Sequence, residues 1–109
     1  MTSRPKNPKK SPDGDVATLV RPKIKRPSQY QVVMLNDDYT PMNFVVYLLI
    51  SQFKHSTEQA VETMLQIHHQ GRAICGVYPF EIAETKAAQT MALARAEQYP
   101  LRCTLEKKP

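Results

Sequence analysis

Apolar positions in the last 80 residues of the chain follow two periods, one typical of strands and one typical of helices. YQVVMLN (30–36) and RAICGVY (72–78) are short apolar runs that contain β-branched and aromatic residues, which predicts two strands. LRCTLE (101–106) alternates apolar with polar residues, which predicts a last strand with one face in water.

The first helical segment lies between the first two predicted strands. MNFVVYLLISQF (42–53) is apolar almost all round, which predicts a largely buried helix. Thr40 is expected to cap this helix, with Pro41 at the first helical position, where its missing N–H costs nothing.

Two further helices are predicted. Ser56 and Gln59 fit a capping box at the start of the second helix, and Gly71 is a ready C-terminal stop. Its residues at helical spacing are Val61, Met64, Leu65 and His68. The third helix follows Pro79, and its narrow face of small residues comprises Ala83, Ala87, Thr90, Met91 and Ala94.

The predicted order of elements is β-α-α-β-α-β. Strands and helices are too few and too unevenly interleaved for a doubly wound sheet. We therefore expect an α+β fold, with a small three-stranded antiparallel sheet packed against three helices.

The basic charge of the chain lies in its N-terminal part. The formal net charge is +5, but residues 1–29 carry +6 and residues 30–109 carry −1. Residues 1–29 also hold five of the nine prolines and none of the eight Tyr and Phe residues. Because they have few apolar side chains to bury, we predict that they form a disordered, basic, Pro-rich extension before one folded domain, residues 30–109.

Location and redox state are indicated by what the sequence lacks. No stretch approaches 18 uninterrupted apolar residues, and no apolar segment follows the basic N-terminus, so we expect a cytoplasmic protein. Cys75 and Cys103 do not form a CxxC pair and are expected to be reduced core residues.

A cluster of polar residues lies between the first predicted strand and the first predicted helix. Asn36, Asp37 and Asp38 precede the predicted cap Thr40. An ordinary turn with a helix cap would explain these residue types, and Asp38 suits such a turn because Asp readily bonds backbone two residues on. Three polar side chains nevertheless exceed what one turn requires, which favours a binding role for Asn36 and Asp37.

His68 is the second candidate for a binding role. It follows the apolar residues of the second predicted helix, where a histidine is more often a core residue than a ligand. A neutral imidazole, however, keeps one acceptor nitrogen. Beside an Asp and an Asn oxygen it would make three converging acceptors, which suit the three donors of an ammonium group.

Apolar residues accompany this set of acceptors. Methionine side chains are unbranched and adaptable, so they serve either as core filler or as the lining of a pocket for several apolar shapes. A cation receptor beside an apolar pocket describes a site for the first residue of a polypeptide chain. The candidate pocket residues are Met42, Met64, Ile67 and Leu101.

Residues 30–109 resemble the ClpS family of bacterial protease adaptors. The resemblance runs through VMLNDDYTPMNFV, MLQIHHQGRAICGVY, EIAETK and PLRCTLEK, which are long blocks in the right order. ClpS adaptors recognise N-terminal destabilising residues (Leu, Phe, Tyr and Trp) for an AAA+ unfoldase of the ClpA type. Their fold resembles the C-terminal domain of the bacterial ribosomal stalk protein, which agrees with the predicted order of elements.

The resemblance implies a role for each matching residue. Asn36, Asp37 and His68 would hold the substrate's α-amino group, and Asp38 and Thr40 would shape the site. Met42 would act as a gate, whereas the pocket would be lined by Met64, Ile67 and Leu101. Family members often have valine in place of Ile67, so the added methylene would narrow this pocket.

The family also implies partners. Glu81 and Lys86 match positions that dock on the N-terminal domain of the unfoldase, although a solvated helix face would also explain them. The partners would be that domain and N-degron substrates, with no membrane, no specific nucleic acid, no metal and no other cofactor. The N-terminal extension would be engaged by the unfoldase during substrate handover.

Two other classes of function fit the sequence less well. An enzyme is not expected, because nothing supports an activated nucleophile and His68 and His69 are adjacent instead of at the i, i+4 spacing of a zinc pair. A basic-tailed nucleic-acid or ribosome-associated protein is the alternative, because the tail can grip phosphates, but residues 30–109 are near neutral.

Overall fold

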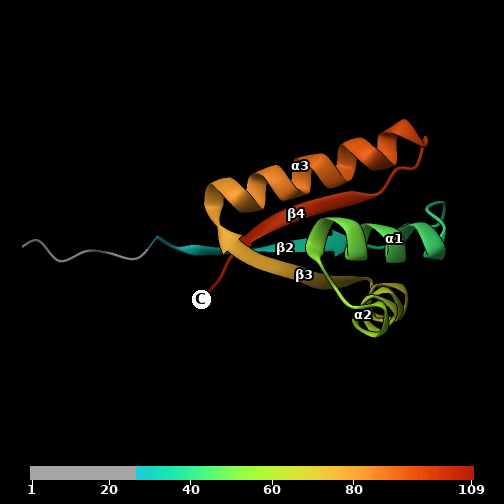
Figure 1. Cartoon of the computed structure of the whole chain (residues 1–109), viewed down its shortest axis with the longest axis horizontal. Coiled ribbons are helices and arrows are strands. Elements are labelled where there is room, and N and C mark those ends of the chain that lie inside the picture. The colour runs from blue at the N-terminus through green and yellow to red at the C-terminus, as the bar shows by residue number, and fades with distance from the viewer. Residues whose placement is uncertain (1–26) are drawn as a thin grey trace, which may run out of the picture.

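The computed structural model describes residues 27–109, and its elements follow the predicted order (Figure 1). They are β2 (Gln29–Leu35), α1 (Met42–Phe53), α2 (Thr57–Gln70), β3 (Arg72–Pro79), α3 (Phe80–Ala96) and β4 (Arg102–Lys107). Gln29 lies in β2 and pairs with Pro79, so the first strand begins one residue before the predicted domain of residues 30–109. The predicted disorder of residues 1–26 lies outside the described residues.

The three strands form one antiparallel sheet in the order β3-β2-β4, as predicted. Val32 in the central strand pairs with Gly76 on one side and Leu105 on the other. The register with β3 shifts after Val32, which leaves Cys75 as the extra residue of a β-bulge. The Cys75 carbonyl accepts a 2.8 Å hydrogen bond from Nε2 of His55, so the bulge anchors the segment between α1 and α2.

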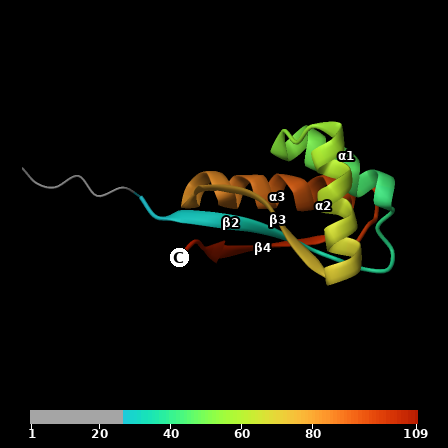
Figure 2. The ribbon, with the colours of Figure 1, turned by 90° about the horizontal axis from the view of Figure 1, so that it is seen from below.

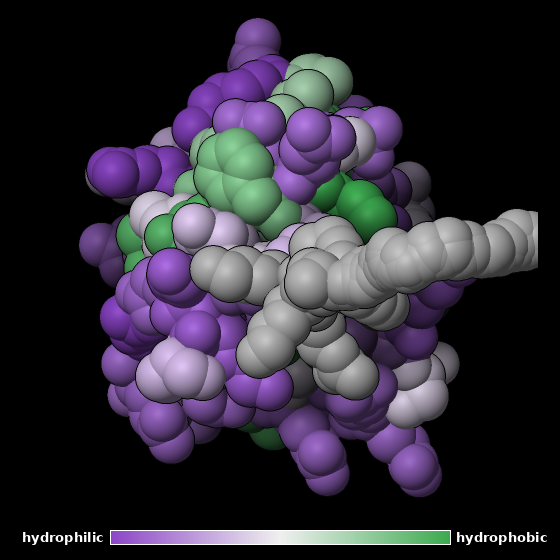
Figure 3. All heavy atoms as spheres, turned by 90° about the vertical axis from the view of Figure 1, so that its left-hand side faces the viewer, coloured by the Kyte–Doolittle hydropathy of each residue, from purple (hydrophilic) through white to green (hydrophobic). Residues whose placement is uncertain are grey.

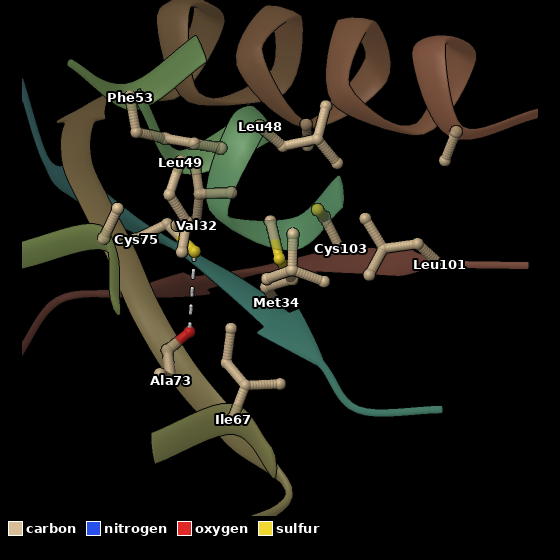
Figure 4. Close-up of a cluster of buried hydrophobic side chains, with 14 of the residues drawn as sticks. Val32, Met34, Leu48, Leu49, Phe53, Ile67, Ala73, Cys75, Leu101 and Cys103 are labelled. Carbon is tan, nitrogen blue, oxygen red and sulfur yellow. Dashed lines mark hydrogen bonds between the residues drawn. The ribbon is translucent and has the colours of Figure 1, made fainter. Parts of the chain in front are cut away.

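The helices pack on one face of the sheet. Figure 2 shows α1 and α3 on the same side of the strands. In the core between these layers, Val32 and Met34 of β2 lie against Leu48 and Leu49 of α1 (Figure 4), and all four are fully buried. Burial of each such side chain stabilises the fold by about 1.5–3 kcal/mol.

The opposite face of the sheet, which we call the open face, has no helix over it within residues 27–109. Val33 points to this face yet is 0% exposed. Arg72 lies opposite Leu35 and Glu106 lies opposite Gln31, and the two side chains form an ion pair of 2.6 Å. This ion pair therefore crosses β2 and covers Val33.

The start of α1 differs from the prediction. Pro41 occupies the N-cap position, and no side chain caps the helix. The hydroxyl of Thr40 donates to Asp37 instead, because the chain turns sharply before the helix begins. The helix is also less buried than predicted, since it exposes Met42, Tyr47 and Ile50.

Ser56 caps the start of α2 and Gly71 ends it, as predicted. The Ser56 hydroxyl accepts a 3.1 Å hydrogen bond from the backbone N–H of Gln59, and Gly71 ends the helix with a φ of 90°, which glycine adopts without strain. The predicted buried face was wrong by about one position. The buried residues are Ala60 and Ile67, whereas the exposed ones are Val61, Leu65 and His68.

The face predicted for α3 and the state of the cysteines are confirmed. Ala83, Ala87, Thr90 and Ala94 are buried, with Met91 half-buried. Cys75 and Cys103 are free thiols in the core, and burial raises the pKa of each to about 12, so both are unreactive at neutral pH. No helix among residues 27–109 is long and apolar enough to cross a membrane.

Candidate functional site

The acidic loop (residues 36–40) and the end of α2 are held together by the backbone. The N–H of Asn36 donates a 2.9 Å hydrogen bond to the carbonyl of Gly71, which directly follows α2. His68, one turn before Gly71, is thereby brought to the acidic loop. The predicted meeting of these two segments is therefore found in the structure.

A concave site lies between the acidic loop, the start of α1 and the second half of α2. Its volume is about 310 Å³, at the lower end of the range of small-ligand sites. We call it the helix-side hollow. Its lining residues are Asn36, Asp37, Asp38, Tyr39, Thr40, Pro41, Met42, Val45, Met64, Ile67 and His68.

Asp37 organises the acidic loop. Its Oδ1 accepts hydrogen bonds of 2.8 Å from the backbone N–H groups of Tyr39 and Thr40. Its Oδ2 accepts a third, also of 2.8 Å, from the Thr40 hydroxyl. Both carboxylate oxygens thus satisfy donors of the turn, as Asp commonly does in such loops.

These bonds decide the charge state of Asp37. Partial burial alone would raise its pKa, but the hydrogen bonds from Thr40 and Tyr39 and the positive charge of Arg95 together outweigh burial. The pKa of Asp37 is therefore lower than usual. At neutral pH the carboxylate is ionised and adds negative charge to the hollow.

The turn hydrogen bonds are made by Asp37 and not by Asp38. The turn predicted for Asp38 is made by Asp37, and the carboxylate of Asp38 accepts no hydrogen bond from residues 27–109. Asp38 is exposed at the edge of the helix-side hollow. All its acceptor sites are therefore available to a ligand.

The predicted pocket residues occupy different depths of the hollow. Met42 is 45% exposed at its mouth, Met64 is half-buried, and Ile67 is 2% exposed at its base. His68 lies on the rim and is exposed, so it is not the core histidine that the apolar spacing allowed.

Leu101 does not line the helix-side hollow directly. It is fully buried and, together with Ile67, lines a much smaller hollow of about 10 Å³ that shares five residues with the larger one. Arg95 holds this segment in place, because its guanidinium donates to the carbonyls of Tyr99 (2.9 Å) and Leu101 (2.7 Å). The prediction that Leu101 lines the pocket is therefore wrong for the helix-side hollow, next to which Leu101 is buried.

Three lining residues were not among the sequence-based candidates: Tyr39, Pro41 and Val45. Val45 lies one turn after Met42 on α1, so helical spacing from Met42 would have indicated it. Tyr39 and Pro41 belong to the loop, where no periodic pattern applies.

Glu81 and Lys86 lie on α3, outside the hollow. Glu81 is exposed in the first turn of the helix. The ammonium of Lys86 donates a 2.9 Å hydrogen bond to the carbonyl of Gln52 near the end of α1, and it lies 5.9 Å from the centre of the Tyr78 ring. Lys86 therefore has a packing role that a solvated helix face does not require.

The arrangement suits binding of a charged, partly apolar group. Within residues 27–109, no three His, Cys, Asp or Glu side chains are grouped so as to hold a metal ion. The hollow instead places oxygen and nitrogen acceptors on its rim and methionine and isoleucine side chains on its wall.

Comparison with known proteins identifies the family. The model of the ATP-dependent Clp protease adaptor protein ClpS matches residues 25–104. The chain belongs to the ClpS family. It is 53% identical over 97 residues to the ATP-dependent Clp protease adapter protein ClpS 2 of Bradyrhizobium diazoefficiens, covering 89% of this chain and 88% of the relative. It is 48% identical over 107 residues to ClpS of Rhodospirillum centenum, covering 98% and 99%.

A solved structure of the ClpS family is similar in fold. Agrobacterium tumefaciens ClpS2 bound to L-phenylalaninamide superimposes with a TM-score of 0.74 and 38% sequence identity, covering 76% of this chain and all of that chain. The α+β fold expected from the sequence is thus the ClpS fold.

Proposed function

We propose that this ClpS-family chain binds the N-terminal residue of a protein substrate in the helix-side hollow and delivers that substrate to a ClpA-type AAA+ unfoldase. The observation that carries the proposal is the juxtaposition of rim acceptors and an apolar wall in one hollow of about 310 Å³. The ligand of the Agrobacterium relative supports it, because L-phenylalaninamide is a phenylalanine with a free α-amino group.

The rim receives the α-ammonium group. Asn36 and His68 each supply one acceptor atom, and Asp38 supplies the negative charge that no residue of the described chain uses. Asp37 contributes its own negative charge at short range while it holds the loop in shape. An ammonium group with three donors matches such a rim, whereas an acetylated or internal residue has no cation to offer.

The wall receives a bulky apolar side chain such as that of Leu, Phe, Tyr or Trp. Met64 and Ile67 line it, and Met42 stands at the entrance. Burying such a side chain stabilises the complex by about 1.5–3 kcal/mol, and each hydrogen bond to the ammonium adds about 1.5–3 kcal/mol. After the cost of association, these terms are consistent with affinity on the order of micromolar.

Titration calorimetry with a peptide that begins with Phe tests this proposal. We expect saturable 1:1 binding of the free peptide and no detectable binding of its N-acetylated form. A matched peptide that begins with Ser tests the apolar wall, and its binding should also be lost. Equal affinities for the free and acetylated forms would overturn the proposal.

Delivery is proposed to use the start of α3. Glu81 is flanked by Phe80 and Ile82, which are 45% and 49% exposed. Figure 3 views this end of the molecule, where apolar groups interrupt a mainly hydrophilic surface. Lys86 lies about one turn further along α3 and is positioned by the Gln52 carbonyl. These residues form a surface separate from the helix-side hollow, so the chain can bind the substrate and the unfoldase at the same time.

Binding to the isolated N-terminal domain of a ClpA-type unfoldase tests the docking surface. We expect Glu81→Lys to weaken this binding strongly. Glu58→Lys is the matched control, because Glu58 is likewise an exposed acidic residue in the first turn of a helix. Equal loss in both variants would show a general charge effect and contradict this assignment.

A further inference from the structure

A second hollow of about 380 Å³ lies against the acidic loop. We call it the open-side hollow. It shares residues 36–39 with the helix-side hollow, so these four residues form the wall between the two. Its other lining residues are Leu35, Pro100 and Arg102.

Apart from the shared residues, the lining of the two hollows comes from different sides of the sheet. The helix-side hollow is completed by residues of α1 and α2, which pack on the covered face. Leu35 points the same way as Val33, two residues earlier, and Arg102 is its cross-strand partner in β4, so both belong to the open face. The acidic loop therefore has one cavity on each side.

An extended peptide presents successive side chains in opposite directions. If the α-amino group is held at the rim formed by the acidic loop, and the first side chain enters the helix-side hollow, the second side chain points away from that hollow. The acidic loop is the wall between the hollows, so the opposite direction leads across it to the open face.

We propose that the open-side hollow receives the side chain of the substrate's second residue and favours an aromatic side chain there. The inference rests on the proposed function, because it requires the first residue in the helix-side hollow. With this subsite, the chain would recognise the first two residues of the substrate.

The residues that line the open-side hollow explain the preference for an aromatic side chain. Leu35, Tyr39 and Pro100 offer apolar surface, and Tyr39 is the most exposed large apolar side chain of the described part at 78%. The guanidinium of Arg102 is exposed and forms no hydrogen bond or ion pair with residues 27–109. A free guanidinium stacks well on an aromatic ring. An aliphatic side chain gains only the apolar contact, and a serine gains neither.

Fluorescence anisotropy with three labelled peptides tests this inference. The peptides begin Phe-Phe, Phe-Leu and Phe-Ser and are otherwise identical. We expect Phe-Phe to bind most tightly and Phe-Ser least, with each step roughly two- to fivefold. Arg102→Ala should narrow the ratio between Phe-Phe and Phe-Ser. Lys107→Ala, which removes a positive charge at the other end of β4, should leave that ratio unchanged.

The outcomes separate the two proposals. Equal affinity for all three peptides, or a ratio that Arg102→Ala does not change, overturns the second-residue subsite while the proposed function stands. If none of the Phe-initiated peptides binds the wild-type protein, both the proposed function and the second-residue subsite are wrong. A direct readout is the Nε–H signal of Arg102 in the ¹⁵N NMR spectrum, which should shift more with Phe-Phe than with Phe-Ser. A shift of equal size would also contradict the subsite.

Discussion

Thr40 and Asp37 are joined by two hydrogen bonds of 2.8 Å, one from the Thr40 hydroxyl to Oδ2 and one from its backbone N–H to Oδ1. Together with the bond from the Tyr39 N–H, they direct both carboxylate oxygens of Asp37 to donors within the acidic loop. The neighbouring carboxylate, Asp38, forms no such bonds within residues 27–109 and is exposed at the edge of the helix-side hollow.

This division predicts different outcomes for the two aspartates. Asp38→Asn removes the free charge, so it should weaken binding of a Phe-initiated peptide roughly tenfold or more without changing the stability of the fold. Asp37→Asn loses the acceptor for the Thr40 hydroxyl, so it should lower the free energy of unfolding by about 1 kcal/mol. Calorimetric titration and urea denaturation of both variants measure the difference. Wild-type affinity in Asp38→Asn would contradict the assignment.

The acid sensitivity of the loop follows from the lowered pKa of Asp37. Its ordinary pKa is 3.8 and its folded pKa is lower, so the folded state binds the proton less tightly than the unfolded state. Its contribution to stability is complete above the unfolded value and is lost as pH falls below 3.8 toward the folded value. The stability difference between wild type and Asp37→Asn in urea denaturation should therefore shrink between pH 6 and pH 3. A difference that stays constant over this range would refute the explanation.

His68 and His69 provide a matched pair on α2. Their ring centres are 5.2 Å apart and both side chains are exposed, but only His68 lines the helix-side hollow. His68→Ala should weaken binding of a Phe-initiated peptide, because one acceptor for the ammonium group is lost, whereas His69→Ala should bind like wild type. Fluorescence anisotropy measures both, and similar losses in the two variants would remove His68 from this role.

Met42 is predicted to exclude β-branched first residues. It stands half-exposed at the mouth of the hollow, where its flexible side chain narrows the entrance. Met42→Ala should therefore raise the affinity for peptides that begin with Ile or Val, measured by competition against a labelled Phe-initiated peptide. If the affinity for these peptides does not rise, Met42 is not a gate.

Ile67 is predicted to limit the depth of the hollow. Ile67→Val removes one methylene from a nearly fully buried position at its base, so a peptide that begins with Trp should gain affinity relative to one that begins with Leu. Ile74→Val is the control, because Ile74 lies half-exposed on the open face. The ratio of the two dissociation constants should change in the first variant only.

Sequence periodicity predicted the order of elements because strands and helices impose different spacings on buried residues. It predicted the cap Ser56 and the stop Gly71 because those roles depend on local chemistry. The buried face of α2 was missed because burial there depends on packing. Ala60 and Ile67 face the core, whereas Val61 and Leu65 remain on the surface.

The sequence indicated most of the residues that line the helix-side hollow, but not all of them. The acidic loop and His68 meet as expected, through the bond from Asn36 to Gly71. Thr40 does not cap α1 as predicted, and its hydroxyl bonds to Asp37 instead. Thr is suited both to a helix cap and to a turn, and only the three-dimensional path of the loop decides which role it takes. Lining residues from the loop, such as Tyr39, have no periodicity to indicate them.

The methionine methyl groups offer the most direct test of the central claim, that a free N-terminal amino acid is held in the helix-side hollow. In protein labelled with ¹³C at the methionine methyl groups, L-phenylalaninamide should shift the signals of Met42 and Met64, which line the hollow, and should leave the buried Met34 and the half-buried Met91 of α3 nearly unchanged. The absence of any shift at saturating ligand, or larger shifts at Met34 and Met91 than at Met42 and Met64, would contradict the account.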